Sequence, residues 1–159
     1  GFENEPRASP FDWRIGRGEN ASARVARGGS ASGASGNRVL HITLDNARIE
    51  FPSIEQTIVL PAGEYLFRGK QSGHLVGPRG LRWRVTCHGN ASPVLGQSQL
   101  LKGRPDLSWH DVEFRFKVPA KACAAQVIRI VLDARTSSET LLFGEVEFDD
   151  LQIRPQASF

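Results

Sequence analysis

Apolar and charged residues alternate strictly between Val112 and Val118, and this alternation is the clearest pattern in the chain. Successive side chains of a strand point to opposite faces, so a period of two predicts a strand with one buried and one solvated face. Residues 38–45 and 81–87 alternate in the same way, with Leu81, Trp83 and Val85 separated by Arg82 and Arg84. The pattern predicts an all-β chain, in which two antiparallel sheets enclose one core.

Nine or ten segments carry such strand signals, and no segment of ten or more residues has a convincing helical period. The small residues of 28–36 indicate a long connection, while 61–63 and 77–80 indicate turns. We therefore expect a β-sandwich or jelly roll that forms a single domain over 1–159. The expected strands are 11–15, 23–27, 38–45, 54–60, 64–70, 81–87, 97–101, 112–118, 124–134 and 146–154.

Composition narrows the class of protein only slightly. The chain has 159 residues, enough to bury a core, and its formal net charge is +3 with a pI near 9.2. This excess is far below the concentrated basic face of a nucleic-acid-binding protein. No apolar run approaches the roughly 20 residues of a membrane-spanning helix. Methionine is absent, so we expect an excised or processed domain of a larger protein.

Cys87 and Cys123 lack the close spacing of a zinc site or a redox pair. One interpretation is a disulfide that ties two strands of an exported domain, and the inward position of Cys87 on its strand favours it. The alternative is two buried free thiols in a cytosolic protein.

Three further segments give the chain a family resemblance, together with the strand that ends at Pro119. They are Gly1-Phe2-Glu3, the run 58–67 with its Pro-Ala-Gly turn, and the stretch 144–151 with Asp149-Asp150. In order and spacing they resemble the galactose-binding-like jelly rolls that serve as carbohydrate-binding modules of bacterial glycoside hydrolases. The arginine-rich composition and the two cysteines also resemble a C-terminal domain of some proteobacterial tetratricopeptide-repeat proteins.

The resemblance implies a structural calcium ion between the first and last strands. Glu3 and Asp149 would supply its carboxylate oxygens, which suit a hard cation. The chain departs from the family pattern in the loop before Arg38, where only Asn37 and backbone carbonyls could serve as ligands. The alternative is that Glu3 and Asp149 simply solvate strand ends.

Modules of this kind hold sugars with aromatic rings and polar side chains on a concave sheet or at loop tips. Trp13 lies near a loop and is the best candidate for an exposed ring, whereas Trp83, Tyr65 and Trp109 have apolar neighbours typical of a core.

Basic side chains occupy the faces that point away from the core. If their strands share the concave sheet, these side chains form a cationic groove for an acidic polysaccharide, since guanidinium groups bind carboxylates bidentately. The alternative is an ordinary solvated face, paired with Glu64, Glu113 and Asp133. The residues assigned to the groove are Arg82, Arg84, Arg68 and His41, with Lys70 and Arg129 beside them.

No arrangement of residues recommends an enzyme. The four histidines are scattered, and no serine lies in a nucleophile-elbow motif. The resemblance therefore implies a non-catalytic carbohydrate-binding domain of a periplasmic or extracellular bacterial protein. The alternative is an interaction or assembly module that docks onto other domains of its parent protein without binding sugar.

Overall fold

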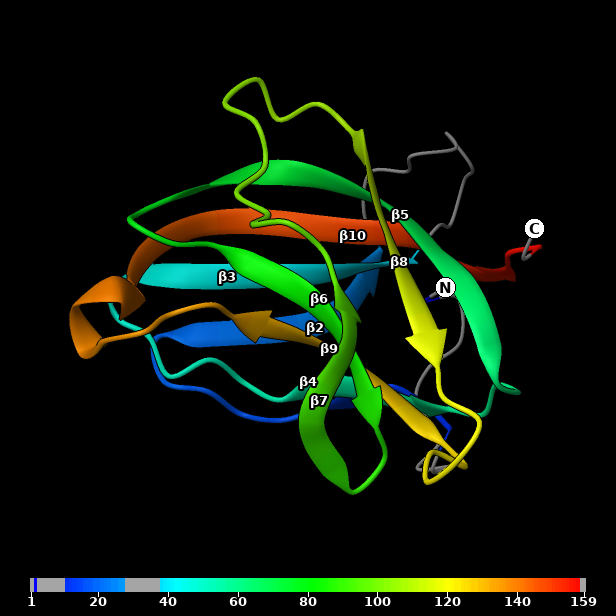
Figure 1. Cartoon of the computed structure of the whole chain (residues 1–159). Helices are drawn as coiled ribbons and strands as arrows, with labels where there is room; N and C mark the ends of the chain where they lie inside the picture. The colour runs from blue at the N-terminus through cyan, green and yellow to red at the C-terminus, as the bar shows by residue number, and fades with distance from the viewer. Residues whose placement is uncertain (1, 3–10, 28–37, 158–159) are drawn as a thin grey trace.

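Two antiparallel five-stranded sheets stack face to face in the computed structural model, which describes residues 2, 11–27 and 38–157 (Figure 1). One sheet has the strand order β1-β4-β9-β6-β7 and is called the first sheet; the other, the second sheet, has the order β2-β3-β10-β5-β8. The strands are β1 (Arg14–Ile15), β2 (Ala21–Arg27), β3 (Arg38–Arg48), β4 (Ile54–Ile58), β5 (Gly63–Val76), β6 (Leu81–Cys87), β7 (Asn90–Gln97), β8 (His110–Val118), β9 (Gln126–Leu132) and β10 (Leu141–Pro155).

This architecture confirms the all-β sandwich expected from the alternation. A short 3₁₀ turn, Ser137–Thr140, precedes β10. The strand expected at 97–101 is wrong, because β7 instead covers Asn90–Gln97. Two register shifts interrupt the pairing of β7 with β6, so its residues do not follow a simple alternation.

The alternating segments place their side chains as predicted. Leu81, Trp83 and Val85 of β6 are fully buried, while β8 buries Val112, Phe114, Phe116 and Val118 and exposes the charged residues between them. Trp83 lies at the centre of the core, with ring centroids 5.8 Å from Trp13, 5.6 Å from Phe67 and 5.4 Å from Phe148. Its indole therefore joins both sheets through aromatic contacts.

Glycines allow the backbone of β5 to approach its neighbours closely. Gly73 has φ +90°, and a Cβ there would lie 2.2 Å from the carbonyl oxygen of Glu145. Gly144 has φ +130°, and its Cβ would lie 2.2 Å from the carbonyl oxygen of His74. Gly103 lies against Gly73 in the same way. Any larger residue at these positions would force the strands apart, so the long β5–β10 pairing depends on glycine here.

None of the helical structure in the described ranges is long and apolar enough to cross a membrane.

Candidate ligand-binding face

Polar side chains form one continuous row across the outer face of the first sheet. Strand register places Arg14 opposite Glu55, Glu55 opposite Arg129, Arg129 opposite Arg84, and Arg84 opposite Gln97. The row therefore touches all five strands in the order β1-β4-β9-β6-β7. We call these five residues the cross-sheet row.

Arg129 and Arg84 differ in their charge partners within the row. Glu55 accepts a hydrogen bond from Arg14 at 2.8 Å and lies 3.3 Å from a guanidinium nitrogen of Arg129. Arg84 donates from Nε to the amide oxygen of Gln97 at 3.1 Å, and it forms no ion pair within the part of the chain that the structure describes. Nε of Arg129 is buried and makes no hydrogen bond to a described residue.

Arg84 and Arg129 are also direct cross-strand neighbours, an arrangement in which like charges repel. Three positive charges in the row thus face one carboxylate. An anionic group placed between Arg84 and Arg129 would relieve this repulsion and satisfy guanidinium N–H groups at the same time.

Side chains flanking the row give it a mixed lining. The next pairs along the sheet bring Thr57, Val127, Thr86 and Val94 to the same face, where Val94 is exposed and the other three are buried. On the other side, a hollow of about 320 Å³ lies beside Glu55 and Arg129, between residues 51–55 and 129–132. The row itself contains no aromatic ring, but Phe51 lines the hollow beside it, so a ligand here would be held by polar contacts and by the apolar surface of this hollow.

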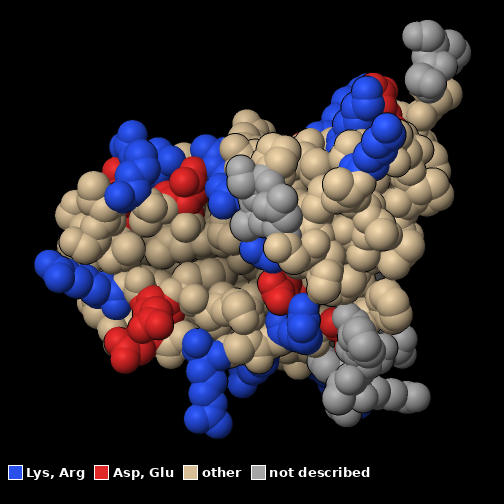
Figure 2. All heavy atoms as spheres, turned by 60° about the horizontal axis from the view of Figure 1, so that its bottom comes forward, with Lys and Arg blue, Asp and Glu red and all other residues tan. Residues whose placement is uncertain are grey.

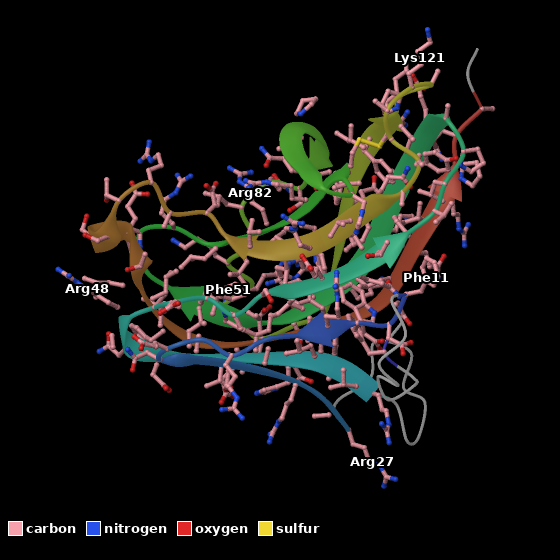
Figure 3. All side chains as sticks on the ribbon, turned by 90° about the horizontal axis from the view of Figure 1, so that it is seen from below. Phe11, Arg27, Arg48, Phe51, Arg82 and Lys121 are labelled. Atoms are coloured by element: carbon pink, nitrogen blue, oxygen red, sulfur yellow. A yellow bond between two sulfur atoms is a disulfide. The ribbon has the colours of Figure 1, made fainter. Side chains whose placement is uncertain are left out.

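Arg82 points outward as predicted but is already neutralised. Its Nε donates to Asp133, which also accepts from Arg79 at 2.9 Å, and Arg79 lies 3.4 Å from Glu139. The hydrogen bond from Arg82 is the main reason that the pKa of Asp133 lies below its usual range. Figure 3 shows Arg82 on the side of the first sheet that faces away from the second. This arginine therefore anchors the end of β9 and leaves little capacity for an external anion.

The predicted groove does not form as a single site, because Arg68 and His41 belong to the second sheet. Arg68 of β5 pairs with Glu113 at 3.3 Å, and His41 of β3 lies 3.9 Å from Glu145. Lys70, also on β5, pairs with Asp111. These side chains point away from the core, as expected, but from the opposite side of the sandwich to Arg84.

The charge distribution agrees with this division. On the face shown in Figure 2, basic side chains stand in several separate groups, and acidic side chains lie beside most of them. The ion pairs of Arg82 with Asp133 and of Arg68 with Glu113 follow this pattern.

Trp13 is not the exposed ring that the sequence suggested. Its side chain is only 8% exposed and packs between Phe2 and Trp83, at centroid distances of 5.0 and 5.8 Å. β1 is only two residues long, so alternation could not assign a face to the tryptophan beside it. Tyr65 is also in the core, where its hydroxyl donates to the carbonyl of Pro61 at 2.7 Å.

The predicted calcium ligands are only partly within the described residues. Asp149 is 1% exposed, which is unusual for a carboxylate, and it lies beside a bulge of β10 where Asp150 has φ +52°. Glu3 and Asn37 lie outside the described residues. Among the described positions, no three His, Cys, Asp or Glu residues gather as a metal site. A buried carboxylate at the last strand fits the chemistry of a calcium site.

Cys87 and Cys123 form a disulfide that links β6 to the loop before β9. The sulfur–sulfur bond is visible near Lys121 in Figure 3. Gln126 holds the same loop: its Oε1 accepts from the Leu60 amide at 2.9 Å, and its Nε2 donates to the carbonyl of Cys123 at 3.0 Å. The bond fits an oxidising compartment.

Comparison with solved structures identifies the fold. No model of a known protein family matches the chain, and no curated protein sequence matches it either. Among solved structures, a CBM4 module superposes with a TM-score of 0.61 at 19% identity, covering 96% of this chain and 92% of that one. The module TmCBM61, solved with β-1,4-galactotriose, gives 0.56 at 19% identity, with coverages of 91% and 88%. The fold is that of a carbohydrate-binding-module jelly roll.

The same fold is not confined to binding modules. The Stig cyclase Fisc from Fischerella sp. TAU, solved with an indole compound, gives a TM-score of 0.61 at 17% identity, covering 99% of this chain and 95% of that one. The likeness therefore establishes the architecture, and the side chains of this chain must decide its function.

The sequence identified Arg84 and Arg129 as outward residues but missed Glu55, Gln97 and Arg14. Each of the three lies on a strand candidate, yet only the register between strands aligns them with the arginines. Nothing in the local sequence of Glu55 distinguishes it from a solvated side chain.

Proposed function

We propose that this chain is a non-catalytic module that binds an acidic polysaccharide on the outer face of the first sheet. The cross-sheet row supports the proposal, because it combines two adjacent arginines with only one carboxylate between β1 and β7. A uronate carboxylate would lie between Arg84 and Arg129, while Gln97 and Glu55 would take sugar hydroxyls. The disulfide is consistent with a periplasmic or extracellular location.

Alanine substitution of Arg84 tests the proposal. We expect Arg84→Ala to weaken binding of polygalacturonate or alginate about tenfold or more, since a charge-assisted hydrogen bond contributes about 1.5–3 kcal/mol. Isothermal titration at two salt concentrations measures this, and binding should weaken with salt because the contacts are partly exposed. Neutral xylan and galactan serve as reference glycans.

Arg68→Ala is the matched control, because it removes an outward arginine from the other sheet. Its affinity should stay within about twofold of the parent protein, since Arg68 pairs with Glu113 away from the row. Equal losses in both variants, or no binding of any acidic glycan with or without calcium, would contradict the proposal.

We also propose that a calcium ion stabilises the domain through Asp149 and Glu3. Millimolar calcium should then raise the melting temperature by several degrees, because a ligand at about a hundred times its Kd adds about 2.7 kcal/mol to stability. Scanning calorimetry with calcium or with EDTA measures the shift. Asp149→Asn should abolish it, whereas Asp106→Asn, on an exposed turn, should retain it. A melting temperature that calcium leaves unchanged would exclude the site.

A second function, an interaction or assembly module, is favoured by one apolar patch. Phe143 and Val76 face each other across β10 and β5, and Leu141 lies beside them; these side chains are 44%, 41% and 47% exposed. The assembly function gains support if no glycan binds and if Phe143→Ser abolishes association with the other domains of the larger protein.

A further inference from the structure

A second, chemically different cavity lies between the two sheets at one end of the sandwich. Its volume is about 440 Å³, within the usual range of small-molecule sites. Its walls come from β4, β9, β5 and β10, together with Phe11 ahead of β1. Figure 3 shows Phe11 at this end of the molecule. The cross-sheet row contributes none of its five residues to the cavity.

No side chain among the described lining residues can ionise. Most of the accessible surface is apolar: Leu60, Leu151 and Ile153 are partly exposed, Phe11 lies at the opening, and the buried side chains of Trp13, Phe67 and Ile128 lie behind them. Phe11 is 55% exposed, a high value for a phenylalanine, and Val59 on the same rim is 61% exposed. Although 23% of the residues in the chain are charged, none of the described residues that line this cavity is charged. A charged ligand here would lose hydration without gaining a partner.

The cavity is equally unsuited to a sugar, whose many hydroxyls need many hydrogen bonds. Gln56 is the polar side chain that belongs to the inward face of β4, because its register partner Ile128 points into the core. Its Nε2 donates to the backbone carbonyl of Phe11 at 2.8 Å, which fixes the amide and leaves Oε1 as an acceptor. Thr57 points to the outer face, and Gln152 accepts from Arg154 on the other side of its sheet.

We infer that this cavity binds a small, uncharged, flat aromatic molecule with one hydrogen-bond donor. The ring system packs against Phe11 and the partly exposed aliphatic side chains of Leu60 and Ile153, and the donor meets Oε1 of Gln56. This site is independent of the polysaccharide face, so the two ligands do not compete.

Fluorescence titration with the neutral probe N-phenylnaphthylamine tests the inference, with unlabelled indole as the competitor. The probe should brighten on binding, and indole should displace it while galacturonate should not. Phe11→Ala should weaken probe binding about tenfold, because it removes an aromatic wall of the cavity. This variant threatens the fold little, since the side chain is more than half exposed.

Phe143→Ala is the matched control, an exposed phenylalanine on the outer face of β10 that should leave the affinity unchanged. Ile153→Trp, which fills the cavity, should abolish probe binding in protein whose melting curve stays cooperative. Arg84→Ala should bind the probe normally, which separates this site from the proposed glycan face. Absence of probe binding to the parent protein, or equal binding by Phe11→Ala and Phe143→Ala, would overturn the inference.

Discussion

Replacing Trp83 by alanine should reduce the free energy of unfolding by about 3–5 kcal/mol, the largest loss expected from any single substitution in this chain. Trp83 is fully buried, and its ring contacts Trp13, Phe67 and Phe148 from both sheets. Removal of the indole leaves a cavity that neither sheet can fill without moving, because the sheets are held apart by the other core side chains. Urea denaturation with the m-value compared between variants measures the loss.

Trp83→Phe separates packing from hydrogen bonding. Nε1 of Trp83 is buried and has no hydrogen-bond partner among the described residues, so losing it costs no hydrogen bond there. The phenylalanine variant should therefore retain most of the stability. Trp109→Ala, at a partly exposed residue before β8, should cost clearly less than Trp83→Ala. A Trp83→Ala variant within about 1 kcal/mol of the parent would show that Trp83 is not the centre of the core.

Removing the disulfide should destabilise the domain by about 4 kcal/mol, the second large effect. Cys87 and Cys123 are 36 residues apart, so the bond restricts a long loop of the unfolded chain. The double variant Cys87→Ala/Cys123→Ala should melt at a markedly lower temperature, and dithiothreitol should lower the melting temperature of the parent protein in the same way.

Hydrogen bonds of Gln126 should hold the loop of Cys123 in place in the double variant. Its side chain ties Leu60 to the loop that carries Cys123, independently of the sulfur atoms. The variant should therefore fold to the same structure and differ mainly in stability. Dithiothreitol should have no effect on the double variant. If it lowers the melting temperature of that variant too, the effect on the parent does not come from the disulfide.

Alternation predicted faces correctly, since a period of two is a local property of each strand. It placed Trp83 and Cys87 inside and Arg82 and Arg84 outside without knowledge of any partner strand. The inward position of Cys87 favoured a disulfide over two free thiols, and the bond between Cys87 and Cys123 confirms that interpretation. The same reasoning failed for Trp13, because the strand that follows it, β1, is too short to show a pattern.

The candidate site required information that no single segment contains. Whether Arg68 and Arg84 lie on one sheet depends on which strands pair, and this is decided by contacts between residues far apart in the chain. The alignment of Glu55 with Arg129 depends further on register, because a slip of one residue would turn Glu55 to the other face. Sequence could therefore supply candidate residues but not the cross-sheet row.

The close backbone approaches at Gly73, Gly103 and Gly144 bear on how distant relatives of this domain can be recognised. Surface arginines can be substituted among homologous domains without loss of the fold. A position where two backbones are in contact tolerates no Cβ. Homologous domains should thus be easier to recognise by these glycine positions than by their surface side chains.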